Sequence, residues 1–145
     1  MEKDGAPLNE EQKKTLRQRF AEMTQNVNKE DVVRLLRIFE GKFKKVRDKL
    51  YHYPPFRVYV RQCELAYEAI RSWSHGEYEL PWQIVGAMTA ALLYVLNPLD
   101  LIPDFIPIIG FVDDIFIITL CIRLVRGELR DYCAAKGLNP KDYGL

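Results

Sequence analysis

Apolar residues recur at helical spacing along most of the chain, and polar or proline-containing breaks separate the runs. This pattern predicts five helices, at about 10–24, 29–50, 55–74, 81–96 and 112–135. In the second and third helices the apolar residues are spaced four and three positions apart, which places one apolar stripe along each helix. These stripes are Val32, Leu36, Phe39, Phe43, Val46 and Leu50, and then Tyr59, Cys63, Ala66, Ile70 and Trp73 with Tyr67 beside them. The fold class is therefore predicted to be all-α, a bundle of about five helices.

Capping residues and helix breakers set the predicted ends of these helices. Asn28 is a favoured N-cap residue. Pro54 and Pro55 end one helix and open the next, and Gly76 and Gly137 suit the left-handed backbone that often closes a helix. With 145 residues, we expect a flexible N-terminus at 1–9, a single helical domain at 10–136 and a tail at 137–145.

The fourth and fifth predicted helices are apolar on nearly all sides. Their sequences include IVGAMTAALLYVL before residue 97 and IFIITLCI after residue 114. A helix of this kind must be buried, either in protein or in lipid. The pairs Gly86 and Ala90, and Ala87 and Ala91, have the small-xxx-small spacing that allows another helix to come close in either environment.

A stretch rich in proline and aspartate, residues 97–114, joins these two helices. Asn97 and Pro98 are predicted to end the fourth helix, because the residue before a proline avoids the α region. Two Asp-x-x-Pro units follow, and in each the aspartate can cap a tight helical turn. The proline lacks a backbone N–H, but an N–H in the first turn has no partner within the helix, so no hydrogen bond is lost. We call this segment the capping elbow, and its predicted structural residues are Asn97, Pro98, Asp100, Pro103, Asp104, Pro107 and Gly110.

The elbow and its flanks resemble the signature of the YkvA-like domain of unknown function, a family of mostly small bacterial proteins. The resemblance rests on Tyr94, the segment PLDLIPDFIP at 98–107, Gly110 and the Asp113-Asp114 pair, and extends over about 65–129 with the segments LAYEAIRS and LPW. Asn97 stands where serine is common in the family, and both residues can cap. The resemblance implies an apolar helical hairpin that is often described as membrane-associated, and no established catalytic residue.

Charge is unevenly distributed, although the net charge is only +1 and gives no reason to expect nucleic-acid binding. Residues 1–75 hold 16 of the 21 Lys and Arg and 11 of the 20 Asp and Glu, a net charge of +5, which leaves −4 for residues 76–145. The second helix has a basic face that is either a solvated surface or a contact for anionic lipid or phosphate. Its residues are Lys42, Lys44, Lys45, Arg47 and Lys49.

The three cysteines are far apart and form no CxxC pair, which favours reduced thiols in a cytoplasm-like compartment. The polar N-terminus lacks the apolar core of a secretory signal. We therefore expect a protein that is not secreted and lies in the cytoplasm or on the cytoplasmic side of a membrane.

Three functions fit these features. The first is a non-enzymatic, membrane-associated protein whose apolar hairpin, about 80–122, enters lipid. Arg71, Arg123 and Arg126 lie outside the two apolar segments and favour keeping both ends on the cytoplasmic side. A shallow hairpin fits better than two full spans, because neither segment is a clean run of ~20 apolar residues.

The second function is a soluble interaction or scaffold bundle with the hairpin as its core. The third is a carboxylate site for Mg²⁺, Mn²⁺ or Ca²⁺, in which the ion could activate water against a phosphoester. Its ligands would be Asp100, Asp104, Asp113 and Asp114. Since helix capping explains each aspartate separately, we expect no cofactor and no enzyme activity. The expected partners are membrane lipid, another protein or a second copy of the chain, with no nucleic acid and no small-molecule substrate identified.

Overall fold

The computed structural model describes the backbone of residues 8–99 and 112–145 and the side chains of 8–96 and 115–145. The helices are α1 (Glu10–Asn26), α2 (Lys29–Leu50), α3 (Pro54–Ser74), α4 (Trp82–Leu99) and α5 (Val112–Lys136), followed by a short 3₁₀ helix, η3 (Pro140–Tyr143). Over these residues the chain contains no β-strand. The prediction of an all-α bundle of five helices is confirmed.

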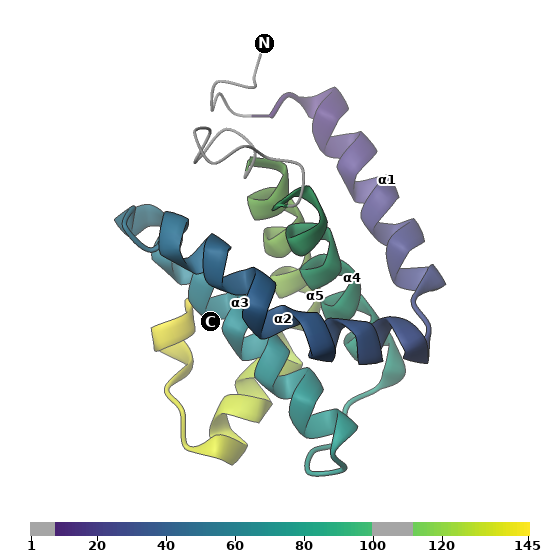
Figure 1. The fold of residues 1–145 in the computed structure, drawn as a ribbon, viewed down its shortest axis with the longest axis vertical. Helices are drawn as coiled ribbons and strands as arrows, with labels where there is room; N and C mark the ends of the chain where they lie inside the picture. The colour runs from purple at the N-terminus through teal and green to yellow at the C-terminus, as the bar shows by residue number, and fades with distance from the viewer. Residues whose placement is uncertain (1–7, 100–111) are drawn as a thin grey trace.

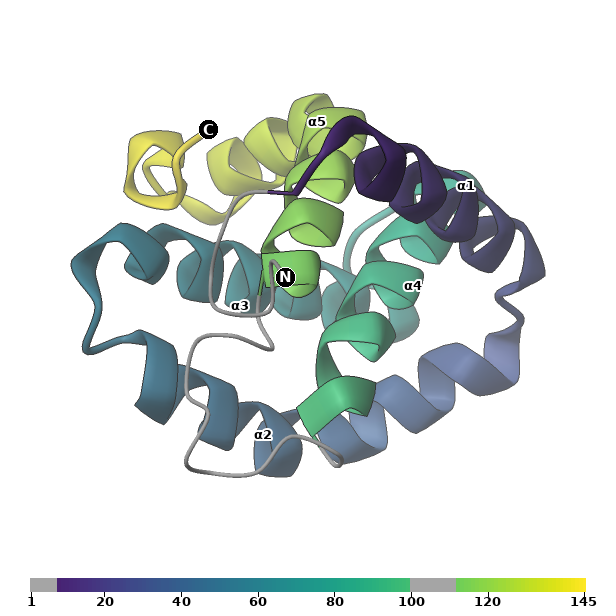
Figure 2. The same cartoon turned by 90° about the horizontal axis from the view of Figure 1, so that it is seen from above.

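Helix α4 lies at the centre of the bundle. It runs beside α5, and α1, α2 and α3 also contact it (Figure 1). The view from above shows α2 on one side of this pair and α1 on the other (Figure 2). Side chains on every face of α4 are almost fully buried, including Val85, Ala87, Met88, Leu92 and Leu96. The protein core is therefore built around the first helix of the apolar hairpin.

The predicted helix ends agree closely with the structure where capping residues specify them. Asn28 and Asp31 form a capping box at the start of α2: the Asp31 amide donates to Asn28 Oδ1 at 2.9 Å, and the Asn28 amide donates to Asp31 Oδ2 at 3.0 Å. Gly76 and Gly137 both have positive φ, +74° and +72°, as expected just beyond α3 and α5.

Helix α4 ends later than predicted. It continues through Asn97 and Pro98 to Leu99. Proline removes one backbone donor and disfavours the α region for the residue before it. In the last turn of a helix those effects cost little, because only a few backbone hydrogen bonds lie beyond the proline. Helix α4 therefore extends about one turn past the predicted stop.

Two details of the apolar stripes differ from the prediction. In α2, Leu36 is predicted to be buried, but it is half-buried and its neighbour Leu35 is fully buried instead. Steps of three and four are both helical, so spacing alone does not choose between them. In α3, Tyr59 and Trp73 are half-buried and Val60 is buried instead. Because α3 packs against α2, α4 and α5 together, its buried surface is wider than one stripe.

The residues predicted as a tail form a packed element. Helix η3 lies against α3, where Gln62 Nε2 donates to the Tyr143 carbonyl at 3.0 Å and the Arg61 guanidinium stacks over the Tyr143 ring at 5.6 Å. Gly144 has φ +69°, and a Cβ there would clash with Val58. These contacts attach the C-terminus to the outside of the bundle.

Candidate functional site

The apolar hairpin is the candidate site, and its first helix is enclosed by protein. Gly86 faces α1, where an added Cβ would lie 3.5 Å from the Thr24 carbonyl oxygen. On another side the Cys121 thiol of α5 donates to the Ala87 carbonyl at 3.6 Å. The close approach predicted from the small residues of α4 is therefore observed on two of its faces. Nearly all apolar side chains of α4 from Val85 to Leu96 are therefore buried by the other helices of the bundle.

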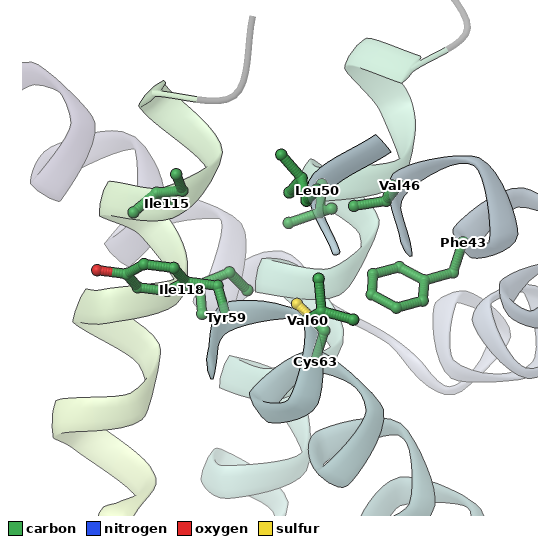
Figure 3. A pocket seen from close by; sticks show the side chains of 9 residues that line it. Phe43, Val46, Leu50, Tyr59, Val60, Cys63, Ile115 and Ile118 are labelled. Carbon is green, nitrogen blue, oxygen red and sulfur yellow. The ribbon is translucent and has the colours of Figure 1, made fainter. Parts of the chain in front are cut away.

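A small apolar cavity lies where four helices meet, beside the last turns of α4 and the first turns of α5 (Figure 3). Its volume is about 20 Å³, room for about one water molecule, but a buried water needs polar partners. The lining side chains offer apolar surface only: Phe43, Val46, Leu50, Tyr59, Val60, Cys63, Val95, Ile115 and Ile118. The cavity is therefore a dry packing gap and offers no recognisable ligand site.

The basic residues of α2 lie on two flanks of the helix. Arg47 points toward α3, and its Nη1 lies 3.7 Å from Glu64 Oε2. Lys44 and Arg47 border a surface hollow of about 530 Å³ between the two helices. At 100° per residue, Lys42 and Lys49 lie on the opposite flank. The sequence grouped these residues because they are adjacent in the chain, but the fold separates them.

The hollow between α2 and α3 also contains carboxylates, so its charge is mixed. Glu40, Glu64 and Glu68 border it, and the Tyr67 hydroxyl donates to Glu40 Oε2 at 3.4 Å. Burial raises the pKa of Glu64, and the nearby Arg47 guanidinium counteracts part of that rise. Two cations facing three carboxylates do not form a simple site for an anion.

The predicted metal ligands Asp100, Asp104, Asp113 and Asp114 lie outside the described side chains, as does the capping elbow. Their capping role and their convergence on an ion both stay predictions. Among the side chains of 8–96 and 115–145, no group of three or more His, Cys, Asp or Glu could hold a metal ion. All three cysteines are buried thiols, and burial raises the pKa of Cys121 to about 12.

The length and hydropathy of the helices limit how the hairpin could meet a bilayer. Over residues 8–99 and 112–145, no helix combines the length and the apolar character that crossing a membrane requires. The exposed aromatic residue nearest the start of the hairpin is Trp82, 38% exposed, with its ring 5.9 Å from that of Trp73. Tryptophan at this position suits the boundary between lipid and water.

Comparison with known proteins places a family match on this hairpin. A family model described as "Protein of unknown function (DUF1232)" matches residues 85–120. The uncharacterized membrane protein YkvA of Bacillus subtilis (strain 168) is 37% identical over 74 residues, which cover 50% of this chain and 70% of that protein. The chain belongs to the YkvA-like family. The family predicted from the elbow sequence is thus confirmed, and no solved structure matches the chain.

One surface of this YkvA-like protein has no recognisable signal in its sequence. Phe116, Leu120 and Leu124 follow one another at steps of four along α5, and Leu124 is 60% exposed. The sequence around them, IFIITLCIRLV, is apolar at nearly every position. A uniform run has no period from which an outer face can be recognised. The fold was needed to show which of these residues the core leaves uncovered.

Proposed function

We propose that this protein is a non-enzymatic helical protein that associates with the cytoplasmic side of a membrane through its α4–α5 hairpin, about 80–122. The observation that carries the proposal is its relation to YkvA, which is described as a membrane protein. The family match at 85–120 falls within this hairpin. The hairpin is also the most apolar part of the chain, with no Lys or Arg between Arg71 and Arg123.

The fold favours a shallow, peripheral mode of association. From Val85 to Leu96, α4 is already covered on nearly all sides by α1, α2, α3 and α5. Exposing it to lipid would require those helices to separate, which would break the core. A folded bundle resting on the bilayer surface avoids that cost, and it agrees with the lack of a spanning helix among the described residues.

A soluble interaction or scaffold bundle is the second candidate function. It is favoured by the same enclosure of α4, because this protein obtains a full hydrophobic core from its own helices. In that case the partner would be another protein or a second copy of the chain. The two candidates differ in where the native protein is found in a cell.

Fractionation tests the proposal directly. Cells expressing the full chain are lysed in low salt, and the membrane pellet is washed first with high salt and then with alkaline carbonate. Peripheral association predicts that the protein sediments with membranes and that one of the washes releases it. If the protein stays entirely in the soluble fraction at low salt, the membrane proposal fails and the scaffold proposal stands.

The four-aspartate metal site has its own test. Isothermal titration of the full chain with Mg²⁺, Mn²⁺ and Ca²⁺ should give heat that Asp113→Asn abolishes if the carboxylates converge on an ion. If they act only as caps, no heat is expected. In that case Asp100→Ala should lower the free energy of unfolding by about 0.5–2 kcal/mol, and Asp100→Asn should cost much less, because asparagine also caps.

A further inference from the structure

The outer face of α5 carries an apolar stripe that the bundle covers only in part. The stripe consists of Phe116, Leu120 and Leu124, the first two half-buried and the third 60% exposed. The opposite face of the helix is buried, for example at Val125 and Leu129. Figure 2 shows α5 at the edge of the bundle between α1 and η3, with no described helix outside it. At 1.5 Å per residue the stripe is about 12 Å long.

Three arginines follow the stripe along one flank of α5. Arg123, Arg126 and Arg130 are exposed, and none of them forms an ion pair with a carboxylate in the described part of the chain. At 100° per residue, Glu128 continues the stripe by one further step of four and Asp131 lies on the same face as Leu124, two turns on, so neither carboxylate lies on the arginine flank. Asp113 and Asp114 precede the stripe, and their side chains are outside the described set. Three arginines without an ion-pair partner among the described residues therefore lie beside a partly exposed apolar stripe.

We propose that this face of α5 is the docking surface for an anionic lipid bilayer. The apolar stripe enters the boundary between headgroups and acyl chains, and the three arginines contact lipid phosphates. The inference rests on the proposed membrane function and specifies the surface that performs it. An apolar stripe flanked by basic residues is the arrangement by which helices lie in a membrane interface. Arginine suits this role because its planar guanidinium binds phosphate through two donors.

The basic face of α2 is the competing surface, and it fits a bilayer less well. Arg47 is paired with Glu64, and the hollow beside Lys44 contains three carboxylates. The exposed apolar residue of α2 is Val33, 59% exposed, which lies three turns before the lysines. Arg37 lies one turn after Val33, but the exposed apolar surface of α2 is this single valine and its cations are interleaved with carboxylates, whereas α5 places three arginines beside an apolar stripe.

Flotation of the full chain with lipid vesicles tests the surface. The vesicles are phosphatidylcholine alone and an equal mixture of phosphatidylcholine and phosphatidylserine. One variant replaces all three α5 arginines with Gln, and another is Leu124→Gln. The matched controls on α2 are the triple replacement of Arg37, Lys44 and Lys45 with Gln, and Val33→Gln, which has nearly the same exposure as Leu124. Circular dichroism checks that each variant remains helical.

The wild-type chain should bind the mixed vesicles and bind phosphatidylcholine weakly. Each arginine near an anionic surface contributes about fivefold in affinity, so the triple variant should bind on the order of 100-fold more weakly. Leu124→Gln should weaken binding by about tenfold, through the lost apolar contact. Both α2 controls should bind within about twofold of wild type, because that surface stays in water.

Two results would overturn these ideas, and they can be told apart. If the wild-type chain binds neither vesicle, the proposed membrane function fails and the docking surface fails with it. If the wild-type chain binds but the α5 variants bind equally well, the membrane function stands and the assignment to α5 is wrong. A loss confined to the α2 controls would move the surface to α2.

Discussion

Replacing Gly86 with alanine gives a sharp test of the contact between α1 and α4. The small-xxx-small spacing suggests that glycine is required there for the helices to meet. The structure indicates otherwise: an added Cβ would lie 3.5 Å from the Thr24 carbonyl oxygen, an ordinary van der Waals distance. The methyl group should therefore fit without moving α1.

The expected effect is a gain in stability. Alanine in a helix interior is favoured over glycine by about 0.8–1 kcal/mol. The new methyl group is buried between α1 and α4 and can add up to about 0.8 kcal/mol. Gly86→Ala should thus raise the free energy of unfolding by about 1–2 kcal/mol. Gly86→Leu should lower it by about 1–3 kcal/mol, because a longer side chain must displace the α1 backbone.

Two other helical glycines provide matched controls. A Cβ added at Gly41 or Gly127 meets nothing within 4 Å, so alanine at either position should yield only the helix-propensity gain of about 1 kcal/mol. Urea unfolding followed by circular dichroism would measure all four variants. A loss of stability in Gly86→Ala, with gains in both controls, would show that α1 lies closer to α4 than the structure indicates.

Three further predictions concern single residues. Asn28→Ala should lower the free energy of unfolding by about 1 kcal/mol, measured by urea titration. Asn28→Asp should leave the free energy of unfolding close to that of the wild type, because aspartate caps equally well. Tyr132→Phe should cost about 1–3 kcal/mol, since the buried Ser72 hydroxyl lies 2.8 Å from the Tyr132 hydroxyl; a double-mutant cycle with Ser72→Ala should give a coupling of about 1 kcal/mol. Burial raises the pKa of Cys121 from 9.0 to about 12. The unfolded thiol ionises first, so stability should fall by about 1.4 kcal/mol per pH unit above pH 9, be unaffected below it, and fall less steeply in Cys121→Ala.

The fold was largely predictable because local signals agree with one another. The cap at Asn28, the proline pair that opens α3 and the glycines after α3 and α5 each define a helix end through backbone chemistry that needs no tertiary partner. Spacing alone could not choose between Leu35 and Leu36, or between Tyr59 and Val60, because that choice depends on which neighbours surround the helix. Packing determines it, and packing is not a local property.

The candidate site was predictable only in part. The apolar hairpin and its family were identified from sequence, since the elbow motif is long and unusual. The basic face of α2 was read from five cations close together in the chain, although Arg47 is directed to Glu64 on another helix. The stripe on α5 was hidden within a uniformly apolar run. Sequence reveals which residues are apolar or charged, whereas exposure depends on the elements that cover them.

The parts of the chain outside the family match explain why α4 is enclosed by protein. A helix that is apolar on all sides needs cover on all sides, and α1 and α2 supply part of that cover from outside residues 85–120. They do so unequally: α2 and α3 contribute six and nine buried residues, and α1 contributes two, Leu16 and Phe20. Because burying a large apolar side chain contributes about 1.5–3 kcal/mol and α1 buries only two of them, α1 is the cover held least tightly. Any event that exposes α4 to lipid or to a partner would therefore begin with the release of α1, while α2 and α3 keep the rest of the core closed.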